Sequence, residues 1–119
     1  MDSFELQLKD DFNLLCVAQW GIRKNLENTI KWFLEEFQDE FPDRIINVGV
    51  AEQNMIGVAT GLALSGKKVC VYSIVPFVTF RCFEQIRNNI SHNNLNIKII
   101  GVGGGFSYGN QGISHNTTE

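Results

Sequence analysis

The chain has 119 residues, of which 44% are hydrophobic and 19% charged, and its formal net charge is -3 at pH 7. A chain of this length forms one modest domain with a single hydrophobic core. It carries no basic stripe that would hold nucleic acid, and no apolar run approaches the length needed to cross a membrane.

The beginning of the chain contains two candidate elements. Residues 12–17 (FNLLCV) fit a short strand. Further along, apolar residues recur at helical spacing and predict an amphipathic helix that ends before Pro42. The residues of this stripe are Leu26, Ile30, Phe33, Leu34, Phe37 and Phe41.

A regular alternation of elements begins at residue 45. Ile45–Val50 is a short β-branched run and predicts a buried strand. A helix is predicted over Met55–Ser65, with Gly66 as its C-cap. Gly57 and Gly61 lie within this helix, and such small residues are expected to let it approach a sheet closely.

The alternation continues to the glycine-rich end of the sequence. Val69–Val75 predicts a second strand, and Phe77–Ile90 predicts a helix whose apolar stripe is Phe80, Phe83, Ile86 and Ile90. Leu95–Val102 predicts a third strand, followed by a glycine-rich loop. Strands alternating with helices predict a three-layer α/β/α fold with a mostly parallel sheet and right-handed crossovers.

The three cysteines are widely spaced, with no CxxC pair among them. This pattern favours buried thiols in a reducing compartment over a disulfide or a zinc site. We therefore expect a cytoplasmic protein that binds no metal through these residues, which are Cys16, Cys70 and Cys82.

Side chains that can do chemistry follow three successive predicted strands. Glu52 follows the first, Phe77 and Phe80 follow the second, and His115 lies in the loop after the third. In open α/β sheets, ligands bind outside the carboxyl ends of the strands. A carboxylate, two rings and an imidazole at that edge would suit a flat, nitrogen-bearing aromatic ligand.

Each of these residues also has a simpler explanation. Glu52 could be a helix N-terminal acid that interacts with the helix dipole. Phe77 and Phe80 could be core residues, and His115 could be a solvated loop histidine. A dinucleotide-binding loop at GVGGGF is rejected, because Phe106 stands where GxGxxG requires glycine and no helix pattern follows.

Two long segments carry a resemblance to a known family. FPDRIINVGVAEQNMIGVATGLALSGKKVCVYSIVPFVTFRCFEQIRNNI and LNIKIIGVGGGFSYGNQGISHNTTE closely resemble the pyrimidine-binding domain of the transketolase family. They look most like the C-terminal-section subunits of split transketolase-like proteins. The resemblance covers residues 36–119, which are interpreted as a partial domain, and leaves residues 1–35 as a divergent N-terminal segment. It implies the thiamine diphosphate-binding fold, incomplete at the C-terminus.

The resemblance implies a role for each candidate residue. Glu52 matches the glutamate that hydrogen-bonds the aminopyrimidine ring of thiamine diphosphate and so activates the cofactor. Burial favours the protonated form of a carboxyl group, which can then share a proton with a ring nitrogen. Phe77 and Phe80 match the aromatic positions that pack on that ring. His115 matches a histidine near the substrate, where it would bind a hydroxyl or move a proton.

The resemblance also implies that this chain works with others. The domain that binds the diphosphate and Mg2+ is absent, so a partner subunit or a homologous chain is expected to supply it. The implied reaction transfers a two-carbon ketol unit between sugars or sugar phosphates, and the chain alone is not expected to be active. Gln111 stands near a position that is often acidic in sugar-phosphate transketolases, which weakens the case for a pentose phosphate.

Two other functions stay open at this point. One is a truncated, catalytically inactive domain that only associates with a partner. The other is a free-standing nucleotide-binding module, which would need a phosphate-cradling loop at a helix N-terminus.

Overall fold

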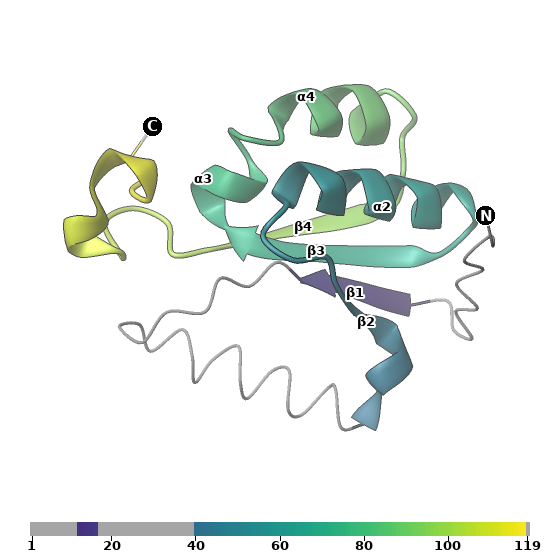
Figure 1. The fold of residues 1–119 in the computed structure, drawn as a ribbon. Coiled ribbons are helices and arrows are strands. Elements are labelled where there is room, and N and C mark those ends of the chain that lie inside the picture. The colour runs from purple at the N-terminus through teal and green to yellow at the C-terminus, as the bar shows by residue number, and fades with distance from the viewer. Residues whose placement is uncertain (1–11, 17–39, 119) are drawn as a thin grey trace, which may run out of the picture.

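The computed structural model describes residues 12–16 and 40–118 of the chain. They form a four-stranded, all-parallel sheet with the strand order β2-β1-β3-β4 (Figure 1). The strands are β1 (Phe12–Cys16), β2 (Ile45–Asn47), β3 (Lys68–Ile74) and β4 (Ile97–Val102). The helical elements are η1 (Pro42–Arg44), α2 (Glu52–Leu64), α3 (Val75–Val78), α4 (Phe83–Gln85), η2 (Ile86–Ser91) and η3 (Gly109–Ser114).

Helices α2, α3 and α4 lie on one face of the sheet (Figure 1). The connections from β2 to β3 and from β3 to β4 run in the same direction across the sheet. Right-handed crossovers therefore place both on the same side, where Figure 1 shows α2, α3 and α4. Most of the predicted helix over residues 26–41 falls outside the described part of the chain. No described helix is long and apolar enough to span a membrane.

The core lies between α2 and the sheet. In β3, alternate residues are buried, as expected for a strand with one face against a helix: Val69, Val71 and Ser73. The buried hydrophobic cluster on this face is Met55, Ile56, Ala59, Val69, Val71, Val78, Cys82 and Ile90. Burial of each large apolar side chain contributes about 1.5–3 kcal/mol, so this cluster is the main source of stability in the described residues.

The turn between β2 and α2 brings the Glu52 carboxylate to the edge of the sheet. β2 ends at Asn47, earlier than predicted, because the Asn47 Oδ1 accepts a hydrogen bond from the Gly49 N–H at 2.9 Å. Gly49 has a φ of 75°, which favours glycine and turns the chain away from the strand direction. Helix α2 then begins at Glu52.

The glycines of α2 do not have the role that the sequence suggested. Gly57 and Gly61 are exposed, and a Cβ built on either one would meet nothing within 4 Å. The close approach to the sheet is therefore made by Ala59, which is fully buried. The C-cap of α2 is Ser65, one residue before the predicted Gly66, which follows it with a φ of 88° and an N–H that donates to the Ala63 carbonyl at 3.0 Å.

The single helix predicted over Phe77–Ile90 is wrong. The chain forms α3, a turn, α4 and the π-helical turn η2 instead. The helical pattern changes after Thr79: the Arg81 N–H donates to the Pro76 carbonyl at 3.2 Å, and the Phe77 carbonyl accepts from the Cys82 thiol at 3.2 Å. The thiol bond competes with a continuous helical ladder.

Candidate functional site

Glu52 is a buried carboxylate at the first position of α2. Its side chain is 4% exposed, and it stands beyond the carboxyl end of β2. A buried charge is costly unless it is paired, so the surroundings of Glu52 should contain a cation or several hydrogen-bond donors. The structure supplies a cation.

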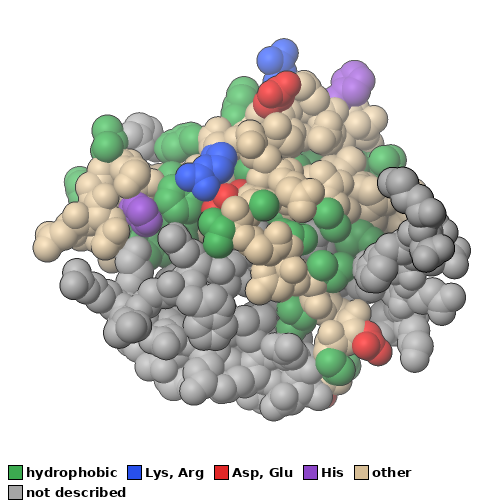
Figure 2. Space-filling view, in the orientation of Figure 1, with side chains coloured by type: hydrophobic (Ala, Val, Ile, Leu, Met, Phe, Trp, Pro, Cys, Tyr) green, Lys and Arg blue, Asp and Glu red, His purple; other side chains and the backbone are tan. Residues whose placement is uncertain are grey.

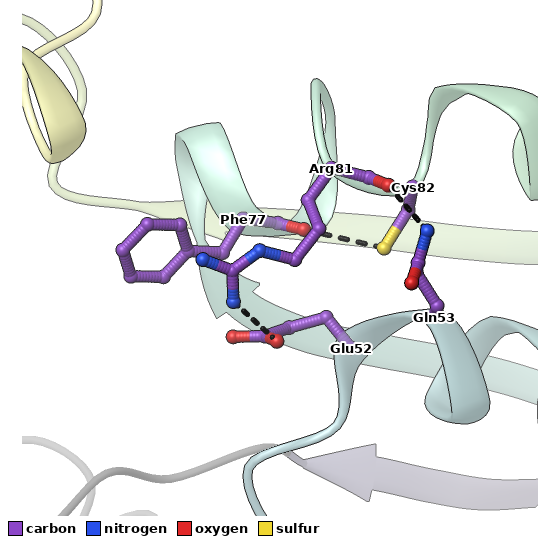
Figure 3. Close-up of polar contacts among 5 residues, drawn as sticks. All are labelled: Glu52, Gln53, Phe77, Arg81 and Cys82. Carbon is purple, nitrogen blue, oxygen red and sulfur yellow. Dashed lines mark hydrogen bonds and ion pairs between the residues drawn. The ribbon is translucent and has the colours of Figure 1, made fainter.

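Arg81 is that partner. Its Nη1 lies 2.8 Å from the Oε2 of Glu52, and the two residues come from α2 and from the turn between α3 and α4 (Figure 3). The Arg81 side chain is 46% exposed, so the pair joins a buried carboxylate to a half-exposed guanidinium. Charge-assisted hydrogen bonds of this length are among the stronger polar contacts in proteins.

The Phe77 ring completes the arrangement. The Cζ of Arg81 lies 4.3 Å from the centre of this ring, within the range of a cation–π interaction. The His115 ring meets the same ring edge-on, with 4.9 Å between centroids and an angle of 73° between planes. Carboxylate, guanidinium, phenyl ring and imidazole thus form one continuous row.

The backbone around Arg81 is held on the start of α2. The amide of Gln53 donates to the Arg81 carbonyl at 3.1 Å, and the Cys82 thiol donates to the Phe77 carbonyl (Figure 3). These bonds connect the turn after α3 to the helix that carries Glu52. The positions of the carboxylate and the phenyl ring are therefore coupled.

His115 reaches the site because its loop closes on itself. The Thr117 N–H donates to the Gly105 carbonyl at 3.0 Å, and the Gly105 N–H donates to the Thr117 hydroxyl at 3.1 Å. Within the closed loop, the buried Tyr108 ring contacts the His115 ring edge-on at 5.7 Å between centroids. His115 thus lies between Tyr108 and Phe77.

Gly103 makes this packing possible, and we expect Gly103→Ala to destabilise the loop. Gly103 has a φ of 72°, and a Cβ there would overlap the Tyr108 ring. The free energy of unfolding should fall by about 1–3 kcal/mol, measured by urea denaturation followed by circular dichroism. Gly104→Ala is the matched control, because its Cβ would meet only ordinary contacts, the nearest at 3.8 Å. Equal stabilities of the two variants would contradict this account.

Titration of the Cys82 thiol is expected to lower the stability of the chain at alkaline pH. Burial, with a further contribution from the Glu52 carboxylate, raises its pKa from 9.0 to about 11, while Arg81 acts in the opposite direction. The folded chain therefore keeps the proton between these pH values, whereas the unfolded chain loses it. The contribution of the protonated thiol to the free energy of unfolding is therefore fully present below pH 9. It is lost as the pH rises toward 11, and the total loss is about 2–3 kcal/mol.

The expected result is a steeper loss of stability above pH 9 in the wild type than in Cys82→Ala, measured by urea denaturation at several pH values. Burial also raises the pKa of Tyr108, but that residue contributes equally to both curves. Parallel curves would show that the thiol does not titrate as described.

The sequence prediction of a buried thiol is confirmed for Cys82, while Cys70 is only half-buried and the side chain of Cys16 lies outside the described residues.

The structure brings three of the four predicted site residues together. Glu52, Phe77 and His115 are joined through Arg81 or by direct ring contact. The ring of Phe80 is 59% exposed. The sequence prediction missed Arg81, because a lone arginine in a helix-like run is typical of a solvent-facing charge.

The row of side chains fits a planar ligand with in-plane N–H groups. A buried carboxylate can accept such an N–H, and the phenyl ring offers an aromatic surface beside it. Among residues 12–16 and 40–118, no three His, Cys, Asp or Glu side chains come together so that they could hold a metal ion. Charged side chains are sparse on the face that carries α2, where hydrophobic ones are scattered (Figure 2).

Comparisons with known proteins identify relatives of this chain. A family model described as transketolase, pyrimidine binding domain matches residues 28–119. The chain is 42% identical over 83 residues to an apulose-4-phosphate transketolase subunit of Actinobacillus succinogenes, an alignment that covers 70% of this chain and 27% of that protein. It is 47% identical over 83 residues to a putative transketolase C-terminal section of Methanocaldococcus jannaschii, covering 70% and 26% of the two chains.

A solved structure is also similar. It is a split gene transketolase in the form of an inactive beta4 tetramer, with a TM-score of 0.60 and 32% sequence identity. The alignment covers 87% of this chain and 30% of that chain. The chain therefore spans between a quarter and a third of the length of these relatives.

Proposed function

The chain belongs to the family of transketolase pyrimidine-binding domains, and on that basis we propose that it binds the pyrimidine half of thiamine diphosphate in a split, transketolase-like enzyme. The enzyme would transfer a two-carbon ketol unit between sugars or sugar phosphates. Two relatives, one named as a transketolase subunit and one as a transketolase C-terminal section, support this assignment.

The observation that carries the proposal is the guanidinium between Glu52 and Phe77. It is planar, positively charged and rich in N–H donors, and a protonated aminopyrimidine ring shares all three properties. A site that already holds one such group between a buried carboxylate and an aromatic face has the chemistry to hold the other. The residues present therefore fit the pyrimidine half of the cofactor.

Each residue of the row has a distinct task in this proposal. The Glu52 carboxyl group would hold a proton at a nitrogen of the pyrimidine ring, and Phe77 would pack on the face of that ring. His115, which contacts Phe77 edge-on, would hydrogen-bond a substrate hydroxyl or move a proton. Thiamine diphosphate, when bound, supplies the nucleophilic carbon that a ketol transfer requires. Phe80 remains a second candidate for the ring contact.

A partner would complete the site. Because this chain spans 27% and 26% of two relatives, most of a transketolase-like protein lies outside it. We propose that a second subunit, or a homologous chain, provides the groups that bind the diphosphate and Mg2+. One of these relatives is itself named as a subunit, which is consistent with assembly from unlike chains.

The full domain would also have a second helical layer. Helices α2, α3 and α4 lie on one face of the sheet (Figure 1). Because both faces of a parallel sheet are normally buried, we propose a three-layer α/β/α arrangement.

Titration calorimetry tests this function. Thiamine diphosphate and Mg2+ are titrated into this chain, into a candidate subunit with a diphosphate-binding domain, and into their mixture. We expect saturable binding in the mixture that is at least tenfold tighter than in either chain alone. A folded chain that adds nothing to the affinity of the partner would contradict the proposal.

A second candidate is a domain that only assembles. It is favoured by the relative that forms an inactive tetramer and by exposed hydrophobic side chains such as Phe83, Phe106 and Ile113. In that case, size-exclusion chromatography with light scattering would reveal an oligomer or a stable complex with the partner. The same complex would bind no thiamine diphosphate in the calorimeter.

A further inference from the structure

We propose that Arg81 is a place-holder, whose guanidinium fills the slot between Glu52 and Phe77 in the cofactor-free chain and leaves it when the pyrimidine ring binds. The proposal rests on the proposed function for the identity of the incoming ring. It assigns to Arg81 a positioning role, because this residue would act through Glu52.

The two groups that would hold the ring are both already in use. The Arg81 Nη1 is 2.8 Å from the Glu52 Oε2, and its Cζ is 4.3 Å from the centre of the Phe77 ring. One planar group that touches both the carboxylate and the ring face leaves no room for a second one there. Guanidinium and pyrimidine would therefore compete for the slot.

The contacts of Arg81 allow its side chain to leave without disturbing the backbone. Its carbonyl accepts from Gln53 at 3.1 Å, and its N–H donates to the Pro76 carbonyl at 3.2 Å. The side chain itself is 46% exposed, so its charged end can rotate into water. When the guanidinium leaves, water can solvate it, and the incoming ring would take over its contact with the buried Glu52 carboxylate.

The place-holder also explains how the buried Glu52 charge is compensated by the chain itself. The Glu52 carboxylate is only 4% exposed, and without Arg81 its charge would lack the cation that compensates it. The same contact lowers the apparent affinity for the ring, because only the fraction of molecules with an open slot can bind. Arg81 would thus stabilise the cofactor-free protein at the expense of cofactor affinity.

The first experiment measures thiamine diphosphate affinity in the complex with the partner subunit by titration calorimetry. Arg81→Met removes the competing charge, and we expect binding to tighten by about five- to thirtyfold. Arg81→Lys keeps the charge but not the planar group, so the gain should be smaller. Arg87→Met, at an exposed arginine of η2, is the matched control and should change nothing. If the wild type binds and Arg81→Met binds equally or more weakly, the place-holder is overturned while the proposed function stands.

The second experiment needs no cofactor. In Arg81→Ala, free methylguanidinium should refill the slot, with saturable changes in the NMR signals of the Phe77 ring at millimolar concentration. The double variant Glu52→Gln, Arg81→Ala should lose this binding, and methylammonium, which is not planar, should bind more weakly. Failure of methylguanidinium to bind overturns the place-holder. If it binds while no complex takes up thiamine diphosphate, the slot stands and the proposed function falls.

A third measurement uses only the wild-type protein and therefore tests the proposal even if the Arg81 variants do not fold. In the wild-type complex, the Arg81 Nε–H resonance should move towards the position of a free arginine when thiamine diphosphate is added. An unchanged resonance in a complex that has bound the cofactor overturns the proposal.

Discussion

Replacement of Glu52 by glutamine should reduce the ketol transfer that we propose for the complex by about 10²–10⁴-fold, the range that positioned proton-transfer groups contribute. An amide cannot share a proton with a ring nitrogen as a carboxyl group does, although it can still accept a hydrogen bond from Arg81. The fold should therefore survive, and the loss should appear in turnover more than in cofactor binding. Steady-state rates with saturating thiamine diphosphate measure the first, and calorimetry measures the second.

The matched control is Glu84→Gln, which removes an exposed carboxylate in the first turn of α4. It should leave turnover within about twofold, because exposed charges away from a site have small effects. Wild-type turnover in Glu52→Gln would remove this residue from the mechanism. If turnover fell equally in both variants, the loss would be explained by the change in net charge and not by a role of Glu52 in the site.

Ile56→Ala should produce a large loss of stability. The Ile56 side chain is fully buried in the cluster between α2 and the sheet. Truncation removes its apolar contacts and leaves a cavity, at a cost of about 2–5 kcal/mol. Because small domains are stable by only about 5–15 kcal/mol, a large part of the folded population is at risk. Urea denaturation of the full chain measures the difference.

Leu64→Ala in the same helix is the control for this prediction. Leu64 is 66% exposed at the end of α2, and alanine is the better helix former. We expect a change within about 0.5 kcal/mol. Similar losses in both variants would mean that α2 is stabilised along its whole surface and that the buried cluster has no special weight.

The strands and the caps were predictable because their signals are local. The β-branched runs at β2, β3 and β4 alternate with helices, and this order alone predicts a parallel sheet. The end of α2 was predictable to within one residue, because Gly66, which has a φ of 88°, directly follows the C-cap Ser65. The break after α3 was not predictable from periodicity. There the Phe77 carbonyl accepts from the Cys82 thiol, while the Arg81 N–H, which a continuous helix would direct to that carbonyl, donates to Pro76 instead.

The site was predictable in outline but not in its connections. Glu52, Phe77 and His115 follow different strands, and the rule that ligands bind at the carboxyl ends of strands brings them to one edge. The contact between Glu52 and Arg81 joins residues 29 positions apart on two elements. Its geometry depends on how the α3–α4 turn packs against α2, which no sequence spacing encodes. Sequence spacing also does not distinguish Phe77, which is half-buried in the structure, from Phe80, which is 59% exposed.

The place of β1 in the sheet has a consequence for how the protein can be made. β1 comes first among the described strands, yet it lies between β2 and β3 and is the only strand that pairs with β2. As the chain leaves the ribosome, each new strand can pair with a strand that has already been made. β2 pairs with one edge of β1, β3 pairs with the other edge, and β4 then pairs with β3. Loss of residues 12–16 would remove the strand with which β2 pairs. The turn that leads from β2 to Glu52 would then no longer be anchored to the sheet.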